Sequence, residues 1–393
     1  MNAKSVIFIA LGATALGGMP MWLLGAYSPQ IVSTFSLGGA QFGAVLGAFF
    51  LFSTLTAIPV GRFVNGISWL TGITLTSLFS AVGLLFLAFF SSGIPLLLVG
   101  LFIASWANSF SQTSANKGLS EGVPRALAGR AFGLKQAALP LSTFVVGLSV
   151  PLFATGDDWR YAFLAIASFA VALGMLALWL LYRRRLHGLV WEGSQVLPDL
   201  KSVRAERTRA PRAVVLLAIG SGIATGATMS FAGFLVLFAV SEGNSPQSAA
   251  LVLALVSFAG IAARIGFGFW ADRAKSGHFM LVTGLILGGA LGFALLAFSN
   301  GLAVLVAGTL LGFALGWAWN GVFHFAVTSS NPTQSAYFTG IIQAAMMAGA
   351  TVTPPAFGLL SQSSFPLAWL MLSGMMVVAA LFIVRGARAI DRH

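Results

Sequence analysis

Cysteine is absent from this 393-residue sequence, and charged residues make up only 8% of it. Without cysteine the chain has no disulfide, no thiolate metal ligand and no cysteine nucleophile. Soluble domains carry roughly a quarter of charged residues. A chain with 58% hydrophobic residues and a mean hydropathy of +0.93 is therefore expected to lie mostly within a lipid bilayer.

The hydrophobic residues gather in long runs that hold no aspartate or glutamate. Each run is long enough to cross a hydrocarbon core of about 30 Å as a helix rising 1.5 Å per residue. We therefore predict an all-α membrane protein with twelve transmembrane helices. The segments fall at 6–33, 38–60, 68–90, 95–118, 128–153, 160–182, 213–240, 246–270, 279–298, 301–325, 335–360 and 365–385.

Positive charge follows the loops on one side of the predicted bundle. With the N-terminus in the cytoplasm, only Arg160 of the 21 lysines and arginines falls in an outside loop. Such a bias predicts a multi-pass protein of the cytoplasmic membrane with both termini cytoplasmic. The net charge of +12 is explained by this topology and by lipid contact, so it indicates no nucleic-acid partner.

Two halves of six segments echo each other across a central polar stretch. Residues 183–212 would be a cytoplasmic linker between an N-terminal half, 1–182, and a C-terminal half, 213–393. GLKQAA at 133–138 matches GIIQAA at 340–345, an offset of 207 that also relates GRFVN, after the second segment, to GFWAD, after the eighth. A parallel duplication of this kind places a substrate between the halves, which rock against each other to give alternating access.

These features resemble the major facilitator superfamily. The resemblance rests on the twelve segments, the central linker, GFGFWADRAK at 266–275 and DDWRYAF at 157–163. It implies a secondary transporter that works without a cofactor, and we expect a monomer. Its G-x-x-x-D-R signature would make Gly268, Asp272 and Arg273 a conformational latch, whereas the first-half copy has Asn65 in place of the acid.

Two narrower resemblances point to small organic anions. Arg264 stands eight residues before Asp272, a spacing that resembles the oxalate and monocarboxylate porters, in which a helix 8 arginine holds the substrate carboxylate. GRAFGLKQAALPL at 129–141 is similar to the helix 5 segment of cyanate- and nitroimidazole-type transporters, in which a Lys-Gln pair and a proline recur.

Arg264 and Lys135 are the basic residues that lie deepest in the predicted membrane segments. Either side chain could extend to lipid headgroups at the cytoplasmic rim, and Arg264 could also pair with Asp272. The alternative is a substrate site between the halves, where a guanidinium grips a carboxylate through a bidentate fork. If helix 8 runs unbroken to Asp272, Arg264 lies about 12 Å inside the rim, which favours the site. Lys117 is expected at the interface.

Neutral side chains could complete such a site. Helices 1, 4, 7 and 10 line the cavity in the superfamily, so the resemblance adds six candidates to Gln136 and its second-half counterpart Gln343. Each could instead hydrogen-bond a neighbouring helix, and the first of the six could lie at the outer interface. The six are Tyr27, Asn108, Gln112, Trp317, Asn320 and His324.

The function that these residues favour is transport of a small organic anion, in particular a monocarboxylate. Exporters of organic cations need an acidic or aromatic site, and no aspartate or glutamate lies within the twelve segments. An enzyme or ATP-driven pump lacks metal-ligand spacing and a phosphate-binding glycine motif, and no loop is long enough for a receptor's output domain. Efflux of a neutral or weakly acidic drug-like compound stays as the alternative. A co-transported proton, on His324 or on the substrate, and a counter-anion are both open as coupling partners.

Overall fold

The computed structural model describes residues 2–124, 127–153, 159–186, 211–274, 276–330 and 335–390. Within these ranges all regular secondary structure is helical, as predicted. The first half holds α1 (Ala3–Ala26), α2 (Ser28–Thr34), α3 (Gly39–Asn65), α4 (Trp69–Phe90), α5 (Ile94–Gly122), α6 (Ala128–Gln136), α7 (Ala138–Phe153) and α8 (Trp159–Leu186). The second holds α10 (Arg212–Ser241), α11 (Pro246–Arg273), α12 (His278–Ala297), α13 (Leu302–Ala314), α14 (Trp319–Ser330), α15 (Ser335–Ser363) and α16 (Phe365–Ile390).

Eleven spans in the described ranges are long and apolar enough to cross a membrane. The 29-residue α15, which packs on α3 and α10, corresponds to the remaining predicted segment. Most of the predicted linker lies outside the described residues, so its course stays a prediction. Both motifs expected in loops lie instead on the last helical turns of α3 and α11, because neither motif contains a proline that would end the helix earlier.

Three predicted spans are each divided into two helices. The first breaks at Tyr27, directly before the Ser-Pro start of α2. The fifth breaks at Ala137, three residues before Pro140. The tenth breaks in the turn at 315–318, where one carbonyl, that of Leu311, accepts from both Leu315 and Gly316. The turn at 315–318 lies near the middle of its span and Ala137 lies closer to the start of its own, and both breaks free backbone carbonyls for other partners.

The two halves meet along α3 with α15, α7 with α11, and α1 with α10. Gly43 of α3 lies against the backbone of Pro354, and a Cβ on Gly147 of α7 would lie 2.9 Å from the carbonyl oxygen of Ala250. Ala250 and Pro354 stand 207 positions after Gly43 and Gly147, so the repeat offset also relates the two interfaces. Backbones approach this closely in membranes where residues are small.

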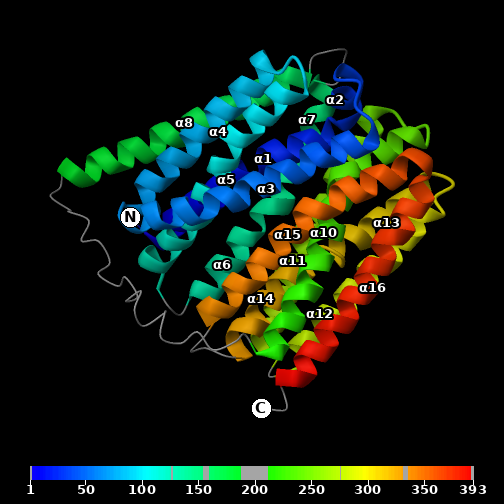
Figure 1. Ribbon diagram of the computed structural model, residues 1–393. Helices are drawn as coiled ribbons and strands as arrows, with labels where there is room; N and C mark the ends of the chain where they lie inside the picture. Colours follow the sequence, from blue (N-terminus) through cyan, green and yellow to red (C-terminus); the bar gives the residue numbers. More distant parts are fainter. Residues whose placement is uncertain are drawn as a thin grey trace.

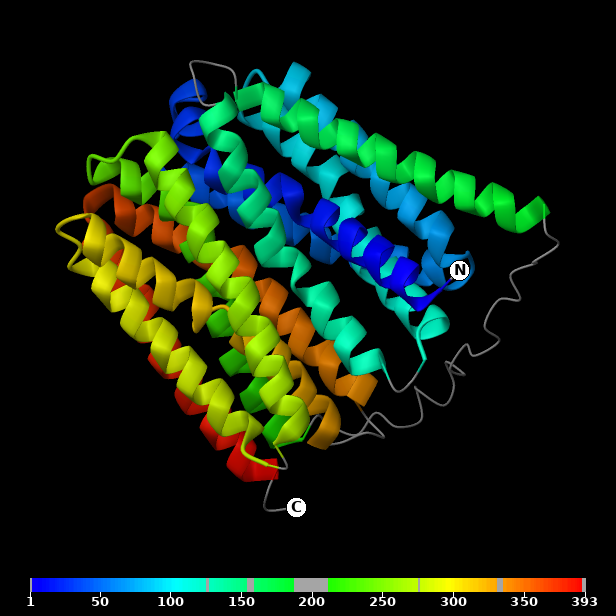
Figure 2. The same cartoon turned by 180° about the vertical axis from the view of Figure 1, so that it is seen from behind.

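The halves touch at one end and separate at the other. The close contacts lie toward the end remote from the termini, whereas both termini lie at the opposite end (Figures 1 and 2). There a Cβ placed on Gly61, Gly133, Gly268 or Gly340 would meet nothing within 4 Å. These glycines form two pairs related by the same offset of 207. The close backbone contacts of the other end are therefore absent at these four positions, and we call the side of the termini the open end.

Two cations hold helix ends within the first half. The Nζ of Lys117 donates to the carbonyls of Val64, Asn65 and Ile67 at 3.0, 3.1 and 2.8 Å, so it caps the C-terminus of α3. Arg160 caps α4 in the same way, with Nη1 donating to the Ala88 carbonyl at 2.8 Å. Unsatisfied carbonyls carry partial negative charge at a helix C-terminus. The expected interfacial lysine is thus bound to the protein backbone.

Candidate functional site

Arg264 of α11 forms hydrogen bonds that join the two halves. α11 runs unbroken through it to Arg273, as predicted, which places it nine residues, or about 13 Å, from the helix end. Its Nη1 donates to the Gln136 carbonyl of α6 at 2.8 Å, and its Nη2 donates to the Trp317 carbonyl at 2.9 Å. The guanidinium is thus turned inward between the halves, bound to neutral acceptors, and is not extended toward the membrane surface.

The Gln136 carbonyl is available because of Pro140. In a continuous helix this oxygen would accept from the N–H of residue 140, but proline has none, and its ring clashes with the carbonyl four residues earlier. The second acceptor, the Trp317 carbonyl, lies in the turn between α13 and α14. Both ligands of Arg264 therefore come from helix breaks, one in each half.

Lys135 is the second cation of the site, with only 2% of its surface exposed. Its Nζ donates to Oε1 of Gln112 at 2.7 Å and to Oδ1 of Asn116 at 2.8 Å, both on α5. Within the described part of the chain, neither Lys135 nor Arg264 bonds to a carboxylate. A buried ammonium held only by amide oxygens lacks the counter-charge that buried ions normally need.

His324 lies in the second half without a polar side-chain contact to either cation among the described residues. It is half-buried on α14, with its ring beside Phe323 at 6.0 Å between centroids. The structure therefore brings five of the predicted residues together where the halves meet, namely Arg264, Lys135, Gln136, Gln112 and Trp317.

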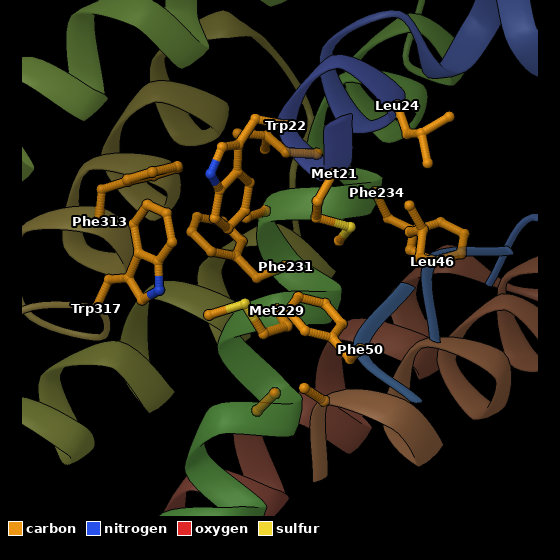
Figure 3. Close-up of a cluster of buried hydrophobic side chains, with 14 of the residues drawn as sticks. Met21, Trp22, Leu24, Leu46, Phe50, Met229, Phe231, Phe234, Phe313 and Trp317 are labelled. Carbon is orange, nitrogen blue, oxygen red and sulfur yellow. The ribbon is translucent and has the colours of Figure 1, made fainter. Parts of the chain in front are cut away.

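An aromatic layer adjoins Arg264, and Figure 3 shows three of its side chains, Trp22, Phe313 and Trp317. The guanidinium of Arg264 lies 5.3 Å from the ring centroid of Trp317. Trp317 in turn meets Trp22 of α1 edge-to-face at 5.2 Å and Phe313 at 5.0 Å. Sequence reasoning missed Trp22 and Phe313 because single aromatic residues in apolar helices look like ordinary core residues.

Two predicted site residues bind elsewhere in the first half. Tyr27 is fully buried, and its hydroxyl pairs with Ser149 of α7 at 3.0 Å. Ser149 stands 13 residues beyond Gln136, or about 20 Å along the helices. Asn108 donates from Nδ2 to Ser53 of α3 at 3.2 Å. These contacts correspond to the helix-packing roles that the sequence left open for both residues.

The other candidates have no polar contact that ties them to the cations within the part of the chain that the structure describes. Asn320 lies half-buried at the start of α14, and Gln343 is exposed on α15 at the open end. Of the predicted latch, Gly268 has free space around it, and Arg273 donates to the Phe269 carbonyl of its own helix at 3.3 Å. The latch stays a prediction. The described residues contain no cluster able to hold a metal ion.

Comparisons with known proteins agree with this architecture. The family profile described as Major Facilitator Superfamily matches residues 10–275 and, in a second match, 217–392. No curated protein sequence matches the chain.

Solved structures share the fold at low identity. The partially occluded, inward open xylose transporter XylE from E. coli gives a TM-score of 0.76 at 16% identity over 98% of this chain and 99% of that one. The nucleoside transporter NupG gives 0.76 at 15% over 98% and 99%. A bacterial homologue of the human lysosomal transporter Spinster, inward-facing and occupied, gives 0.73 at 14% over 99% and 96%.

Proposed function

The chain belongs to the Major Facilitator Superfamily, and from that premise we propose that this secondary transporter carries small organic anions, monocarboxylates in particular. It is a multi-pass membrane carrier and not an enzyme. The observation that carries the proposal is the pair of neighbouring cations Arg264 and Lys135, whose hydrogen bonds within the described residues all go to neutral oxygens. An anion supplies the charge that this site lacks.

Carbonyl oxygens hold Arg264 in a position that a carboxylate can take over. Hydrogen bonds from a guanidinium to a carboxylate are roughly twice as strong as neutral ones and form as a planar pair. A substrate carboxylate can therefore displace the Gln136 carbonyl, and with it the bond that Arg264 makes to the first half. Binding then changes a contact between the halves, which is what alternating access requires.

Arg264→Lys tests the proposal. Lysine keeps the charge but loses the bidentate fork, which should cost about 1.5–3 kcal/mol, or roughly ten- to hundredfold in the dissociation constant for acetate or lactate. Isothermal titration calorimetry on the purified protein measures it. Arg62→Lys, on an exposed residue of α3, is the matched control and should bind like the parent. Unchanged binding by Arg264→Lys would show that the guanidinium holds no substrate.

The same titration separates anion transport from drug efflux. A carrier of small anions binds the carboxylate and not the corresponding primary amide, because the amide brings no charge to Arg264 and Lys135. Equal affinity for acetate and acetamide would favour a site for neutral compounds.

A further inference from the structure

An aromatic surface adjoins the cation Arg264. Trp317 belongs to both parts of the site: its carbonyl accepts from Arg264 at 2.9 Å, and its ring lies 5.3 Å from the guanidinium. Its ring also packs edge-to-face on Trp22, 5.2 Å away. Because Trp22 is on α1 and Trp317 is between α13 and α14, this aromatic pair joins the two halves directly beyond the anion position.

Trp22 carries a buried donor without an acceptor. Only 4% of the residue is exposed, and its Nε1 has no hydrogen-bond partner in the described structure. The indole lies over Gly18, one turn earlier on α1, where a Cβ would be 2.7 Å from Nε1. An unpaired buried N–H is unfavourable, so a ligand that brings an acceptor atom to this donor would gain affinity.

The side chains around this pair are apolar and adaptable. Figure 3 shows Met21 and Phe231 next to the two tryptophans, and Met229 and Phe50 further along the same cluster. These four residues come from α1, α3 and α10. Rings gain from edge-to-face packing, and methionines adjust to ligands of different shape. A sugar needs many hydrogen-bonding groups around its hydroxyls, and these residues offer none apart from the indole N–H groups.

The charged and aromatic parts lie at different depths. Arg264 and Lys135 lie nine and seven residues from the ends of α11 and α6 at the open side, whereas Trp22 and Trp317 lie near the middle of their spans. A ligand that enters from the open end with its carboxylate on the cations would therefore contact Trp317 and then Trp22 with the rest of its structure.

We propose that the transported anion is an aromatic monocarboxylate, with its carboxylate on Arg264 and its ring on Trp317 and Trp22. This inference rests on the proposed function and narrows it from small organic anions to those with a planar apolar body. Burial of a ring supplies affinity that acetate or oxalate cannot obtain from this surface.

Calorimetry with benzoate and acetate tests the inference. Benzoate should bind at least about tenfold more tightly than acetate, because its ring leaves water for the aromatic layer. Trp22→Leu should lower the affinity for benzoate on the order of tenfold and leave acetate unchanged. Trp369→Leu is the matched control: Trp369 is fully buried in the second half, and its Nε1 is also unpaired, so a general loss of packing would show there equally.

Gly18→Ala offers a second variant that removes no packing. Alanine favours the helix relative to glycine, but its Cβ must displace the Trp22 indole, so benzoate affinity should fall while thermal stability holds. A contrary result would be equal binding of benzoate and acetate by the parent protein, with both lost in Arg264→Lys. That result would contradict the proposal of an aromatic substrate and support the proposal of an anion carrier. If neither anion binds the parent protein, both the proposed anion transport and the proposed aromatic substrate are wrong.

Discussion

The two lysines near the open end show how burial alone does not identify a functional residue. Lys117 donates to three carbonyls at the C-terminus of α3, where the helix dipole favours a cation. Lys135 donates to two side-chain oxygens, and its burial is not compensated by a formal charge. The first lysine stabilises the fold, whereas the second is retained at a cost to stability, as binding residues often are.

Methionine substitutions should therefore have opposite effects at these two positions. Lys117→Met keeps the side-chain stem but leaves helix carbonyls unpaired, so it should lower stability by about 1.5–3 kcal/mol without changing anion affinity. Lys135→Met removes an uncompensated buried charge, so it should keep or raise the melting temperature and weaken anion binding. Thermal unfolding with and without benzoate measures both. A similar loss of stability in both variants would contradict the distinction.

Among the elements, the broken fifth span contributes most to the site. Pro140 interrupts the backbone ladder between α6 and α7, and the freed Gln136 carbonyl becomes the first-half ligand of Arg264. A helix break thus presents a backbone acceptor within the membrane where a side-chain acceptor would otherwise be needed.

Pro140→Ala should restore the N–H that Gln136 lacks. The new bond within the helix competes with Nη1 of Arg264 for the Gln136 carbonyl. A carboxylate that binds Arg264 then has a weaker bond to that carbonyl to displace. The dissociation constant for benzoate should fall roughly two- to tenfold, and transport into proteoliposomes should slow because α6 no longer bends against α7. Pro151→Ala, near the other end of α7, is the control and should change neither quantity. Weaker binding with an unchanged transport rate would contradict this role of the carbonyl.

The sequence predicted the elements better than the contacts between them. The depth of Arg264 followed from the apolar run up to Asp272, and the structure confirms the unbroken α11. The break at Ala137 was not predicted, although the missing N–H of Pro140 explains it. The pairing of Arg264 with Gln136 and Trp317 depends on how two halves align in space, which no local pattern encodes. The turn at 315–318 was missed because glycines such as Gly316 are common in unbroken membrane helices.

At the scale of the whole molecule, the internal repeat builds both the closed end and the open end. Gly43 with Pro354 and Ala250 with Gly147 close one end, and Gly133 and Gly340 face free space at the other. Because the same offset relates these positions, each half contributes one close interface and one open surface. Rocking about the level of Arg264 would reverse which end is in contact.

Closure of the open end should depend on the anion. Arg264 already bonds to the carbonyl of Gln136, the residue next to Lys135, and two uncompensated cations repel each other more strongly when closure removes water from around them. A bound carboxylate removes this repulsion. Single-cysteine variants are free of background because the chain has no native cysteine. Gly133→Cys and Gly340→Cys should react with a membrane-impermeant maleimide added on the side of the termini, and benzoate should slow both reactions.

Thr143→Cys is the control for this measurement, because Thr143 is buried in the closed contact and bonds to Ser257 at 2.8 Å. It should stay unlabelled with or without ligand. If the empty carrier resists closure, proteoliposomes with anion on both sides should equilibrate label faster than one-sided loading permits, and His324→Gln should keep this exchange. The opposite result has two parts: benzoate leaves both labelling rates unchanged, and net uptake follows a proton gradient and is lost in His324→Gln. That result would identify the histidine as a proton carrier.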